Sequence, residues 1–433
     1  MKLAIIADDL TGANDSGVQL AKYGLATSVF LKADSKNLLD NEAVVFDTDS
    51  RAIDAEAAKR KVENITQFLL ANQFETIYKK IDSTMRGNIG AEIIGFHNQL
   101  KTDFILVAAA YPKNERTIIN GYHYLKGKLL SETEIADDPV TPVKESHLPT
   151  LLAQQINEKI GHINLDLLHA GKAAILAYLE ELKVKGITFV VVDSKVEEDL
   201  QLLLEMTKEI RFSIGWVGSA GLANYLPKYL NIKEQHIDLK IMDHNKPILT
   251  IVGSVNVNSR KQLQLLLKEK NICGIKMDSY KAVSDAEVRK QEMSRVFSEA
   301  KQAAESGLDV VVYSSGEKED ITYAREIGAE NGFNYKQTSN EIVVMIAGIT
   351  SVLIEEALFQ GVVMTGGDTA KQVSERWNVT GFRLYDELEI GVPISSFIGI
   401  DDIYVVTKAG GFGTDTVFIK AIERLRGVDL HVK

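Results

Sequence analysis

The chain has 433 residues, of which 45% are hydrophobic and 25% are charged, and its formal net charge is −11. This length is too great for one compact core, so we expect two domains in a well-folded protein with little disorder. The acidic balance and the lack of a basic stripe argue against nucleic acid as a partner.

The single cysteine, Cys273, lies in an apolar context and is expected to be a buried structural thiol. No apolar run reaches the ~20 residues of a membrane span. The run that begins at Met1 ends at Asp8 without the small residues of a signal cleavage site. The sequence therefore predicts a cytoplasmic protein without a membrane partner.

Short β-branched runs alternate with longer helical patterns from the N-terminus onward. This alternation predicts βαβ units on a mostly parallel sheet. Residues 111–149 lack the alternation and are rich in proline and glycine, which predicts a loop insert long enough to be functional. The elements predicted before the insert are strands at 3–7, 44–46, 76–78 and 104–108 and helices at 13–23, 55–70 and 89–98.

The alternation resumes after the insert and continues to the C-terminus. A polar, charged stretch ends at Pro247 just before an apolar strand, which is typical of a linker. We therefore expect a first domain at 1–235, a linker at 236–246 and a second domain at 247–433. Each domain is expected to be α/β, with a mostly parallel sheet flanked by helices. The elements predicted here are helices at 171–185, 197–209, 259–270, 288–305, 342–360 and 416–425 and strands at 188–192, 248–252, 310–313, 362–364 and 403–407.

Two adjacent carboxylates, Asp8 and Asp9, directly follow the first predicted strand. Ligands of open α/β sheets bind beyond the carboxyl ends of the strands, so at least one of the two is expected to face a crevice. A carboxylate there can accept the proton of a substrate hydroxyl or orient that hydroxyl toward a phosphoryl group. The alternative is a structural role, with Asp9 or Thr11 capping the following helix.

A second polar loop follows the strand at 76–78 and contains Lys80, Ser83, Thr84 and Arg86. Its hydroxyls and the forked guanidinium of Arg86 suit a carboxylate ligand. The alternative is a surface loop with a helix cap and a solvated ion pair.

Glycine-rich turns follow apolar strands in the second half of the chain. Thr365-Gly366-Gly367-Asp368-Thr369 and Gly410-Gly411-Phe412-Gly413 each precede a helix, and Gly253-Ser254 and Ser314-Ser315-Gly316 extend the pattern. Backbone N–H groups and a helix dipole at such turns favour an oxyanion, and glycine permits its close approach. The alternative for each is a plain strand-to-helix turn, since neither a P-loop nor a Gly-x-Gly-x-x-Gly pattern is present.

Other common site signatures are missing from the sequence. The eight histidines show no zinc-ligand spacing, and no Gly-x-Ser-x-Gly occurs, so neither a protein-bound metal nor an elbow-type serine hydrolase is expected. His97, His123 and His147 are interpreted as polar residues of helices or loops.

Four segments in order, 7–17, 80–88, 365–369 and 408–413, carry a resemblance to a known family. By these segments the chain resembles the four-carbon acid sugar kinases, which use ATP to phosphorylate tetronic acids such as threonate, erythronate and 3-oxo-tetronate. The likeness covers nearly the whole chain. It implies an N-terminal acid-sugar-binding domain, a C-terminal nucleotide-binding domain and an active site in the cleft between them.

The resemblance also implies roles for individual residues. Asp9 or Asp8 would orient and deprotonate the terminal hydroxyl, Arg86 would pair with the carboxylate of the acid, and ATP would bind with Mg²⁺. Gly411 stands where the family often has asparagine. The substrate-side positions are Asp8, Asp9, Lys80, Ser83 and Arg86, and the ATP-side positions are Ser254, Gly366, Gly367, Asp368, Thr369, Gly410 and Gly411.

Residues 13–22 and 137–142 look more like the D-threonate and D-erythronate kinases than the 3-oxo-tetronate branch. The expected reaction is therefore transfer to the 4-hydroxyl of D-threonate or D-erythronate. The alternatives are a 3-oxo-tetronate 4-kinase, an NAD(P)-dependent sugar-acid oxidoreductase and a non-catalytic ATP-binding regulator. The expected partners are a small sugar acid and ATP, and a homodimer is left open.

Overall fold

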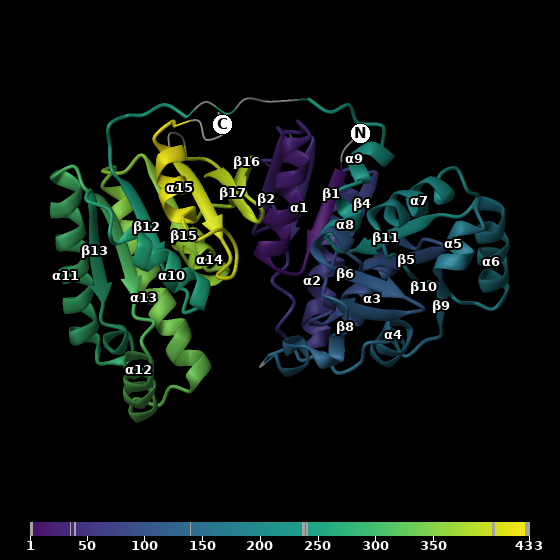
Figure 1. Cartoon of the computed structure of the whole chain (residues 1–433), viewed down its shortest axis with the longest axis horizontal. Coiled ribbons are helices and arrows are strands. Elements are labelled where there is room, and N and C mark those ends of the chain that lie inside the picture. Colours follow the sequence, from purple (N-terminus) through teal and green to yellow (C-terminus); the bar gives the residue numbers. More distant parts are fainter. Residues whose placement is uncertain are drawn as a thin grey trace. The chain divides into compact units, whose positions relative to one another are not determined.

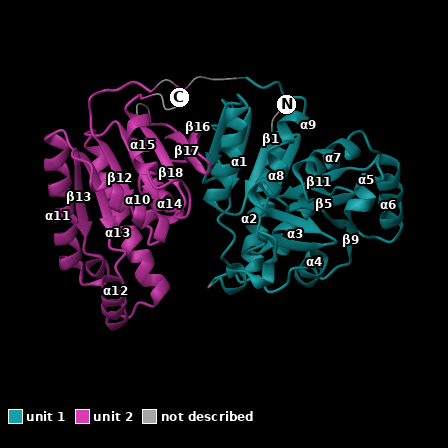
Figure 2. Cartoon of the chain, in the orientation of Figure 1, with its two compact units in different colours: residues 1–236 teal, residues 237–433 magenta. Residues whose placement is uncertain are grey.

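The computed structural model describes residues 3–34, 36–38, 40–138, 140–235, 239, 241–400 and 403–428. The chain divides into two compact units, residues 1–236 and 237–433 (Figure 2). The expected linker at 236–246 lies at this division, but its residues 236–238 and 240 are outside the described residues, as are Met1 and Pro139. Each unit has its own sheet and helices.

The described sheet of unit 1 has the strand order β2-β3-β1-β4-β11-β5-β10-β9, and all its neighbouring strands pair in parallel (Figure 1). Most of these strands are buried along their whole length, as expected for a sheet covered by helices. The parallel α/β architecture is thus confirmed. The strands are β1 (Leu3–Ala7), β2 (Thr27–Phe30), β3 (Ala43–Asp47), β4 (Thr76–Lys80), β5 (Phe104–Ala108), β9 (Ile160–Ile163), β10 (Phe189–Val192) and β11 (Ile214–Gly218).

Helices flank this sheet, and their starts follow from side-chain caps. Asp54 caps α2 by accepting from the backbone N–H groups of Glu56 and Ala57. The first helix begins at Leu10, earlier than predicted, because Asp9 caps it. The helices of unit 1 are α1 (Leu10–Lys22), α2 (Ala55–Ala71), α3 (Ile89–Leu100), α4 (Leu148–Ile156), α5 (Leu165–His169), α6 (Lys172–Val184), α7 (Glu197–Thr207), α8 (Ala220–Ala223) and α9 (Leu226–Tyr229).

The insert at 111–149 is more ordered than the expected loops. It contains a three-stranded antiparallel sheet, β6 (Arg116–Ile119), β7 (Tyr122–Leu125) and β8 (Lys128–Leu129), and the short helices η1 (Pro112–Asn114), η2 (Leu130–Glu132) and η3 (Glu134–Asp137). The first hairpin turns at Asn120 and Gly121, whose φ angles of 52° and 77° match the positive values of a two-residue type I′ turn.

Unit 2 has the described strand order β13-β14-β12-β15-β18-β17-β16. The first five strands pair in parallel, and β17 pairs antiparallel with both of its neighbours. The strands are β12 (Ile248–Val252), β13 (Ile272–Met277), β14 (Asp309–Ser314), β15 (Gly361–Thr365), β16 (Gly381–Glu389), β17 (Val392–Phe397) and β18 (Tyr404–Lys408). The helices are α10 (Val257–Leu266), η4 (Ser279–Val283), α11 (Ala286–Glu305), α12 (Lys318–Glu330), α13 (Tyr335–Glu355), α14 (Gly367–Arg376) and α15 (Val417–Leu425).

One sequence expectation in unit 2 needs correction, and helix α13 bears on another. Cys273 is only partly buried, because it lies on β13 at the edge of the sheet rather than in the core. Helix α13 is, among the described helices, the one that is long and apolar enough to cross a membrane by length and composition. Since 56% of its apolar window is buried inside the protein, and it packs against α11 and α14, these features also fit a core helix.

A buried ion pair supports the carboxyl edge of the unit 1 sheet. Nζ of Lys79 on β4 lies 2.8 Å from Oε2 of Glu92 on α3, and both side chains are at most 1% exposed. Lys79 also donates to the carbonyl oxygens of Ile6 and Lys80, at 3.3 and 2.8 Å. Ser50 donates from Oγ to Oε1 of Glu92 at 2.7 Å. These contacts link two strands, a helix and the segment that follows β3.

We expect Lys79→Met to destabilise unit 1 by about 3–5 kcal/mol, because it leaves the Glu92 carboxylate buried without its partner. The double variant Lys79→Met/Glu92→Gln should recover at least half of that loss, since no buried charge remains. Urea unfolding followed by Trp216 fluorescence measures both, in a Trp377→Phe background that leaves a single tryptophan in the chain. Equal losses in the single and the double variant would contradict the explanation.

Candidate active site

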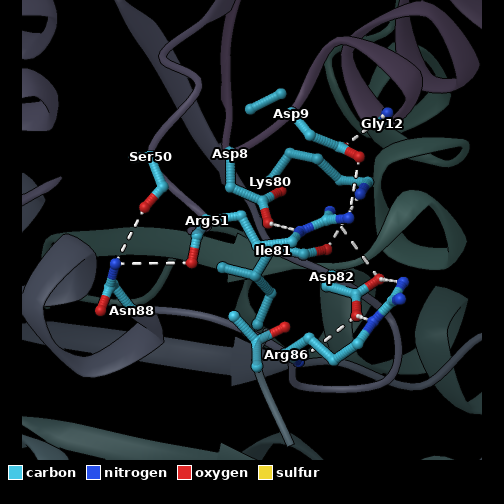
Figure 3. A network of polar contacts seen from close by, with 12 residues as sticks. Asp8, Asp9, Gly12, Ser50, Arg51, Lys80, Ile81, Asp82, Arg86 and Asn88 are labelled. Carbon is cyan, nitrogen blue, oxygen red and sulfur yellow. Dashed lines mark hydrogen bonds and ion pairs between the residues drawn. The ribbon is translucent and has the colours of Figure 1, made fainter. Parts of the chain in front are cut away.

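Three loops meet at the carboxyl edge of the unit 1 sheet. They follow β1, β3 and β4, and β1 lies between the other two strands. Strands β2 and β3 lie on one side of β1, and the strands that follow in sequence, beginning with β4, lie on its other side. Ligands of open α/β sheets bind where the strand order reverses in this way. The loops bring Asp8 and Asp9, Arg51, and Asp82 together (Figure 3).

Arg51 joins the three loops. Its Nε lies 2.7 Å from Oδ2 of Asp8, and its Nη1 lies 2.8 Å from Oδ2 of Asp9. Its Nη2 lies 3.8 Å from Oδ1 of Asp82, so one guanidinium faces three carboxylates. The side chain of Arg51 is 18% exposed and that of Asp8 is 3% exposed, so water screens these charges weakly. Neither Arg51 nor Asp82 was among the predicted site residues.

The backbone holds the Arg51 loop in place. The N–H groups of Ser50 and Arg51 donate to the carbonyl oxygen of Asp8 at 3.0 and 3.3 Å. Nδ2 of Asn88 donates to the carbonyl oxygens of Ser50 and Ile53 at 2.9 and 2.7 Å. The guanidinium is therefore fixed before any ligand arrives, which favours catalysis by preorganised charge.

The two neighbouring aspartates have different environments. Burial alone would raise the pKa of Asp8, but the positive charges of Arg51, Lys80 and Lys79 hold that pKa below its ordinary value of 3.8. Burial raises the pKa of Asp9 against the opposing effect of Arg51, and the negative charge of Asp8 adds to the rise. Two carboxylates whose pKa values are pushed apart suit different roles, one ionised throughout and one able to exchange a proton.

Asp9 also caps α1, so the structural alternative for this residue holds as well. Its Oδ1 accepts from the backbone N–H of Gly12 at 2.9 Å. A Cβ at Gly12 would lie 2.8 Å from Oδ1 of Asp9 and 2.9 Å from Nζ of Lys80. Glycine is therefore needed for the lysine ammonium and the aspartate to approach the helix start so closely.

The remaining predicted residues of unit 1 lie at the end of β4 and in the loop that follows it. Lys80 is buried, donates from Nζ to the carbonyl oxygen of Ile81 at 2.9 Å and makes no ion pair in the described part of the chain. Ser83 is half-buried, and its hydroxyl has no hydrogen bond to the described residues. Both side chains are thus available for a ligand.

Arg86 has partners of its own. Its Nε and Nη2 lie 2.7 and 3.3 Å from the two carboxylate oxygens of Asp82, and its Nη1 lies 3.4 Å from Oδ2 of Asp138. Arg51 and Arg86 together outweigh burial and hold the pKa of Asp82 well below its ordinary value. Because the Arg86 side chain is 29% exposed, the remaining guanidinium hydrogens can still reach a ligand.

A cavity of about 200 Å³ adjoins this network. Arg51 is the member of the network that lines it, together with Gly87 and Asn88 and with Thr141 and Val143 of the insert. The predicted residues Asp8, Asp9, Lys80, Ser83 and Arg86 are not among its lining residues. One water molecule needs about 10–15 Å³ of such space, so the cavity has room for a small organic acid.

The glycine turns of unit 2 lie at the carboxyl edge of its own sheet. They follow β12, β15 and β18, which are neighbours in that order, and α14 begins at Gly367 without a side-chain cap. Gly366 has a φ of 102°, which favours glycine. The first N–H groups of α14 are therefore available to an anion.

These turns approach one another closely. A Cβ at Gly410 would lie 2.6 Å from Oγ of Ser254, and one at Gly253 would lie 2.6 Å from Oγ1 of Thr369. The structure thus brings the predicted ATP-side residues of the three turns together, while Asp368 and Gly411 are exposed at their rim.

His123 differs from its expected role as a polar helix or loop residue. It is fully buried on β7, and both ring nitrogens lack a hydrogen-bond partner among the described residues. Burial lowers its pKa to about 4, so the ring is neutral near pH 7. His97 lies on α3 and His147 at the start of α4, as expected of polar helix residues.

Family models match both units. A sugar-binding N-terminal domain matches residues 3–226, and a nucleotide-binding C-terminal domain matches residues 249–418. The chain is 33% identical over 428 residues to the D-threonate kinase of Salmonella typhimurium, with 98% of each chain covered. It belongs to the four-carbon acid sugar kinase family.

The names of other similar proteins give different substrates. The D-erythronate kinase of Heliobacterium modesticaldum is 27% identical, covering 98% of this chain and 97% of that protein. The 3-oxo-tetronate kinase of Pseudomonas savastanoi pv. phaseolicola is 26% identical, with the same coverage. A solved structure of a Haemophilus influenzae protein shares the fold with a TM-score of 0.78 at 23% identity, covering 98% of this chain and 100% of that chain. The chain is therefore a four-carbon acid sugar kinase.

We expect Arg51→Gln to destabilise unit 1 by about 3–5 kcal/mol at pH 7.5, because buried carboxylates lose their common partner. In the wild type the pKa values of Asp8 and Asp82 are lowered, so their stabilising charge is present at pH 7.5 and is lost only as the pH falls below about 4. In the variant burial raises these pKa values, so its deficit should shrink between pH 7.5 and about pH 4.5 as the carboxylates take up protons.

Urea unfolding at the two pH values, followed by Trp216 fluorescence, measures this difference. Arg60→Gln is the matched control, because Arg60 is 60% exposed and its one ion pair among the described residues is with Glu56 at 3.6 Å. It should change stability by less than about 0.5 kcal/mol at either pH. A deficit of Arg51→Gln that grows toward acid pH would contradict the assigned charges.

Proposed function

We propose that the chain uses ATP to phosphorylate the terminal hydroxyl of D-threonate or D-erythronate, giving a 4-phosphotetronate. The main support is the preorganised Asp8–Arg51–Asp9 group beside an acid-sized cavity. The similarity to a D-threonate kinase over 98% of the chain favours D-threonate first. In this proposal unit 1 binds the acid and unit 2 binds ATP, as the names of the two family models suggest.

The proposed acceptor side divides its work between the two aspartates. Asp9, with its raised pKa, accepts the proton of the substrate hydroxyl as the oxygen attacks the γ-phosphorus, and the bond from that phosphorus to the β–γ bridging oxygen breaks to release ADP. Asp8 remains ionised and holds Arg51 in position. Lys80, Ser83 and Arg86 bind the substrate, with the cations directed at its carboxylate.

The proposed donor side consists of the turns at Ser254, 366–369 and Gly410–Gly411, whose backbone N–H groups hold the phosphates. Mg²⁺ neutralises phosphate charge when it is bound with ATP. Among the described residues no group of three or more His, Cys, Asp or Glu side chains could hold a metal ion. This fits a magnesium ion held mostly by phosphates and water, with the exposed Asp368 as the carboxylate that unit 2 offers.

A coupled ADP-release assay over four-carbon acids tests the function. We expect ATP turnover that depends on the acid, with the highest kcat/KM for D-threonate or D-erythronate. A preference for 3-oxo-tetronate would assign the chain to the other branch. Reduction of NAD(P) with the acid, or ATP binding without acid-dependent ADP release, would replace the kinase reaction with an oxidoreductase or a regulator.

We expect Asp9→Asn to lower kcat by about 10²–10⁴-fold, the usual contribution of a general base. Asparagine also caps helices well, so α1 should persist and the melting temperature should change little. Asp54→Asn is the matched control, because Asp54 makes the same kind of cap at α2 but is exposed and outside the site. Steady-state kinetics and thermal unfolding of both variants measure the effect, and an equal loss of kcat in both would remove Asp9 from its role.

A further inference from the structure

Lys408 is the last residue of β18 and lies where the glycine turns of unit 2 meet. It is 4% exposed. Its Nζ lies 3.1 Å from Oγ of Ser259, 3.4 Å from Oγ1 of Thr365 and 3.3 Å from the carbonyl oxygen of Gly410. The ammonium also lies 5.4 Å from the centre of the Phe418 ring. None of these groups titrates near neutral pH.

The positive charge of Lys408 has no counter-ion in the described part of unit 2. Burial alone lowers its pKa to about 8, and no neighbouring charge acts on it. A buried ammonium without an anionic partner is unfavourable, and such groups often mark functional sites. This differs from Lys79 in unit 1, whose charge is met by Glu92 at 2.8 Å.

The partners of Lys408 come from two of the turns and from the helix that follows the third. Thr365 directly precedes Gly366, Gly410 lies in the turn after β18, and Ser259 lies on α10, which follows the Ser254 turn. Oγ of Ser259 donates to the carbonyl oxygen of Gly410 at 2.8 Å, so that hydroxyl is free to accept from Lys408. The ammonium therefore lies beside Gly410 itself and beside Thr365, the residue directly before Gly366.

A second cation lies at the same edge of the sheet. Arg260 donates from Nη1 to the carbonyl oxygen of Ser314 at 2.6 Å and makes no ion pair among the described residues. Its Nε is buried without a partner in that part of the chain, and a Cβ at Gly316 would lie 2.5 Å from it. Among the described residues, neither Lys408 nor Arg260 makes an ion pair, although the charge of Glu317 acts on Arg260 from a greater distance.

We infer that Lys408 is a nucleotide-binding residue whose ammonium interacts with the phosphate chain of ATP or ADP, which supplies the missing negative charge. The inference rests on the proposed use of ATP and adds a residue that the three turns alone do not provide. Lys408 also fixes the shape of these turns through its contacts with Ser259, Thr365 and Gly410. Nucleotide binding should then favour its protonated form.

Calorimetric titration with ADP, without an acid substrate, tests the inference. Lys408→Met should weaken ADP binding about ten- to hundred-fold at pH 7, because the phosphates lose their attraction to a buried and therefore weakly screened positive charge. The affinity of the wild type should fall as the pH rises from 7 to 9.5, because Lys408 loses its proton above about pH 8. The variant should show no such fall, since the phosphates are already fully ionised at pH 7.5 and above.

Two further variants make the test specific. Lys408→Arg should recover part of the affinity and keep it at pH 9.5, because the guanidinium stays charged. Lys261→Met removes an equal charge from α10, but Lys261 is 60% exposed and pairs with Asp415, so this variant should bind ADP like the wild type. The melting temperature of Lys408→Met should not fall, because the substitution removes a buried charge.

The outcomes separate the inference from the proposed function. Wild-type affinity in Lys408→Met would overturn the inference while leaving the kinase proposal intact. Weaker binding together with a lower melting temperature and an unchanged pH dependence would assign Lys408 a purely structural role, which also overturns it. If the wild type does not bind ADP at all, both the use of ATP and the role of Lys408 fail.

Discussion

The charge balance around Arg51 is the constraint on which the site of unit 1 depends. Three carboxylates crowded near one point would repel one another and take up protons unless a cation were fixed between them. Arg51 meets this need because its planar fork can contact several carboxylate oxygens at once. The contacts of Ser50 and Asn88 keep the fork in place, so the electrostatics of the site are a property of the folded unit.

The parallel sheet makes this balance attainable. Strands β3 and β4 both pair with β1, and their registers align Ala7 with Asp47 on one side and with Lys80 on the other. Three loops distant in sequence therefore leave the sheet side by side. Beneath them, the Lys79–Glu92 pair fixes the separation of β4 and α3. The same edge of the sheet in unit 2 carries glycine turns and two cations, Lys408 and Arg260, that make no ion pair with the residues described there, and this suits the proposed binding of phosphate.

Much of the fold could be predicted from the sequence because fully buried parallel strands appear as short apolar runs, as at 3–7 and 248–252. Strands β2, β9, β11, β13, β16 and β17 of the two large sheets were not predicted, and for some of them the physical cause is plain. Strand β2 has only four residues, and β13 and β16 carry polar or charged side chains on one face. The hairpins of the insert were interpreted as loops, although Asn120-Gly121 is a strong two-residue turn signal.

The site was only partly predictable. Asp8 and Asp9 could be located because they end an apolar run. The loop of Lys80 could be located because it follows the predicted strand at 76–78. Arg51 lies four residues beyond β3 in a segment without glycine or any motif, and its importance depends on the pairing of β1 with β3. Long-range pairing of this kind cannot be read from local composition. Lys408 could not be singled out from local composition either. That no counter-ion lies near it among the described residues depends on every element packed around it.

The two aspartates show why adjacent identical residues cannot be assigned roles from sequence. Oδ1 of Asp9 accepts from Gly12 and its Oδ2 contacts Arg51, yet a carboxylate offers about four lone-pair positions, so acceptor capacity remains for a substrate hydroxyl. The side chain of Asp9 is 26% exposed, against 3% for Asp8, so Asp9 is the one that a ligand can reach. In the proposed reaction the helix cap also serves catalysis, because it fixes the carboxylate that must meet the hydroxyl while Arg51 and Asp8 fix its charge.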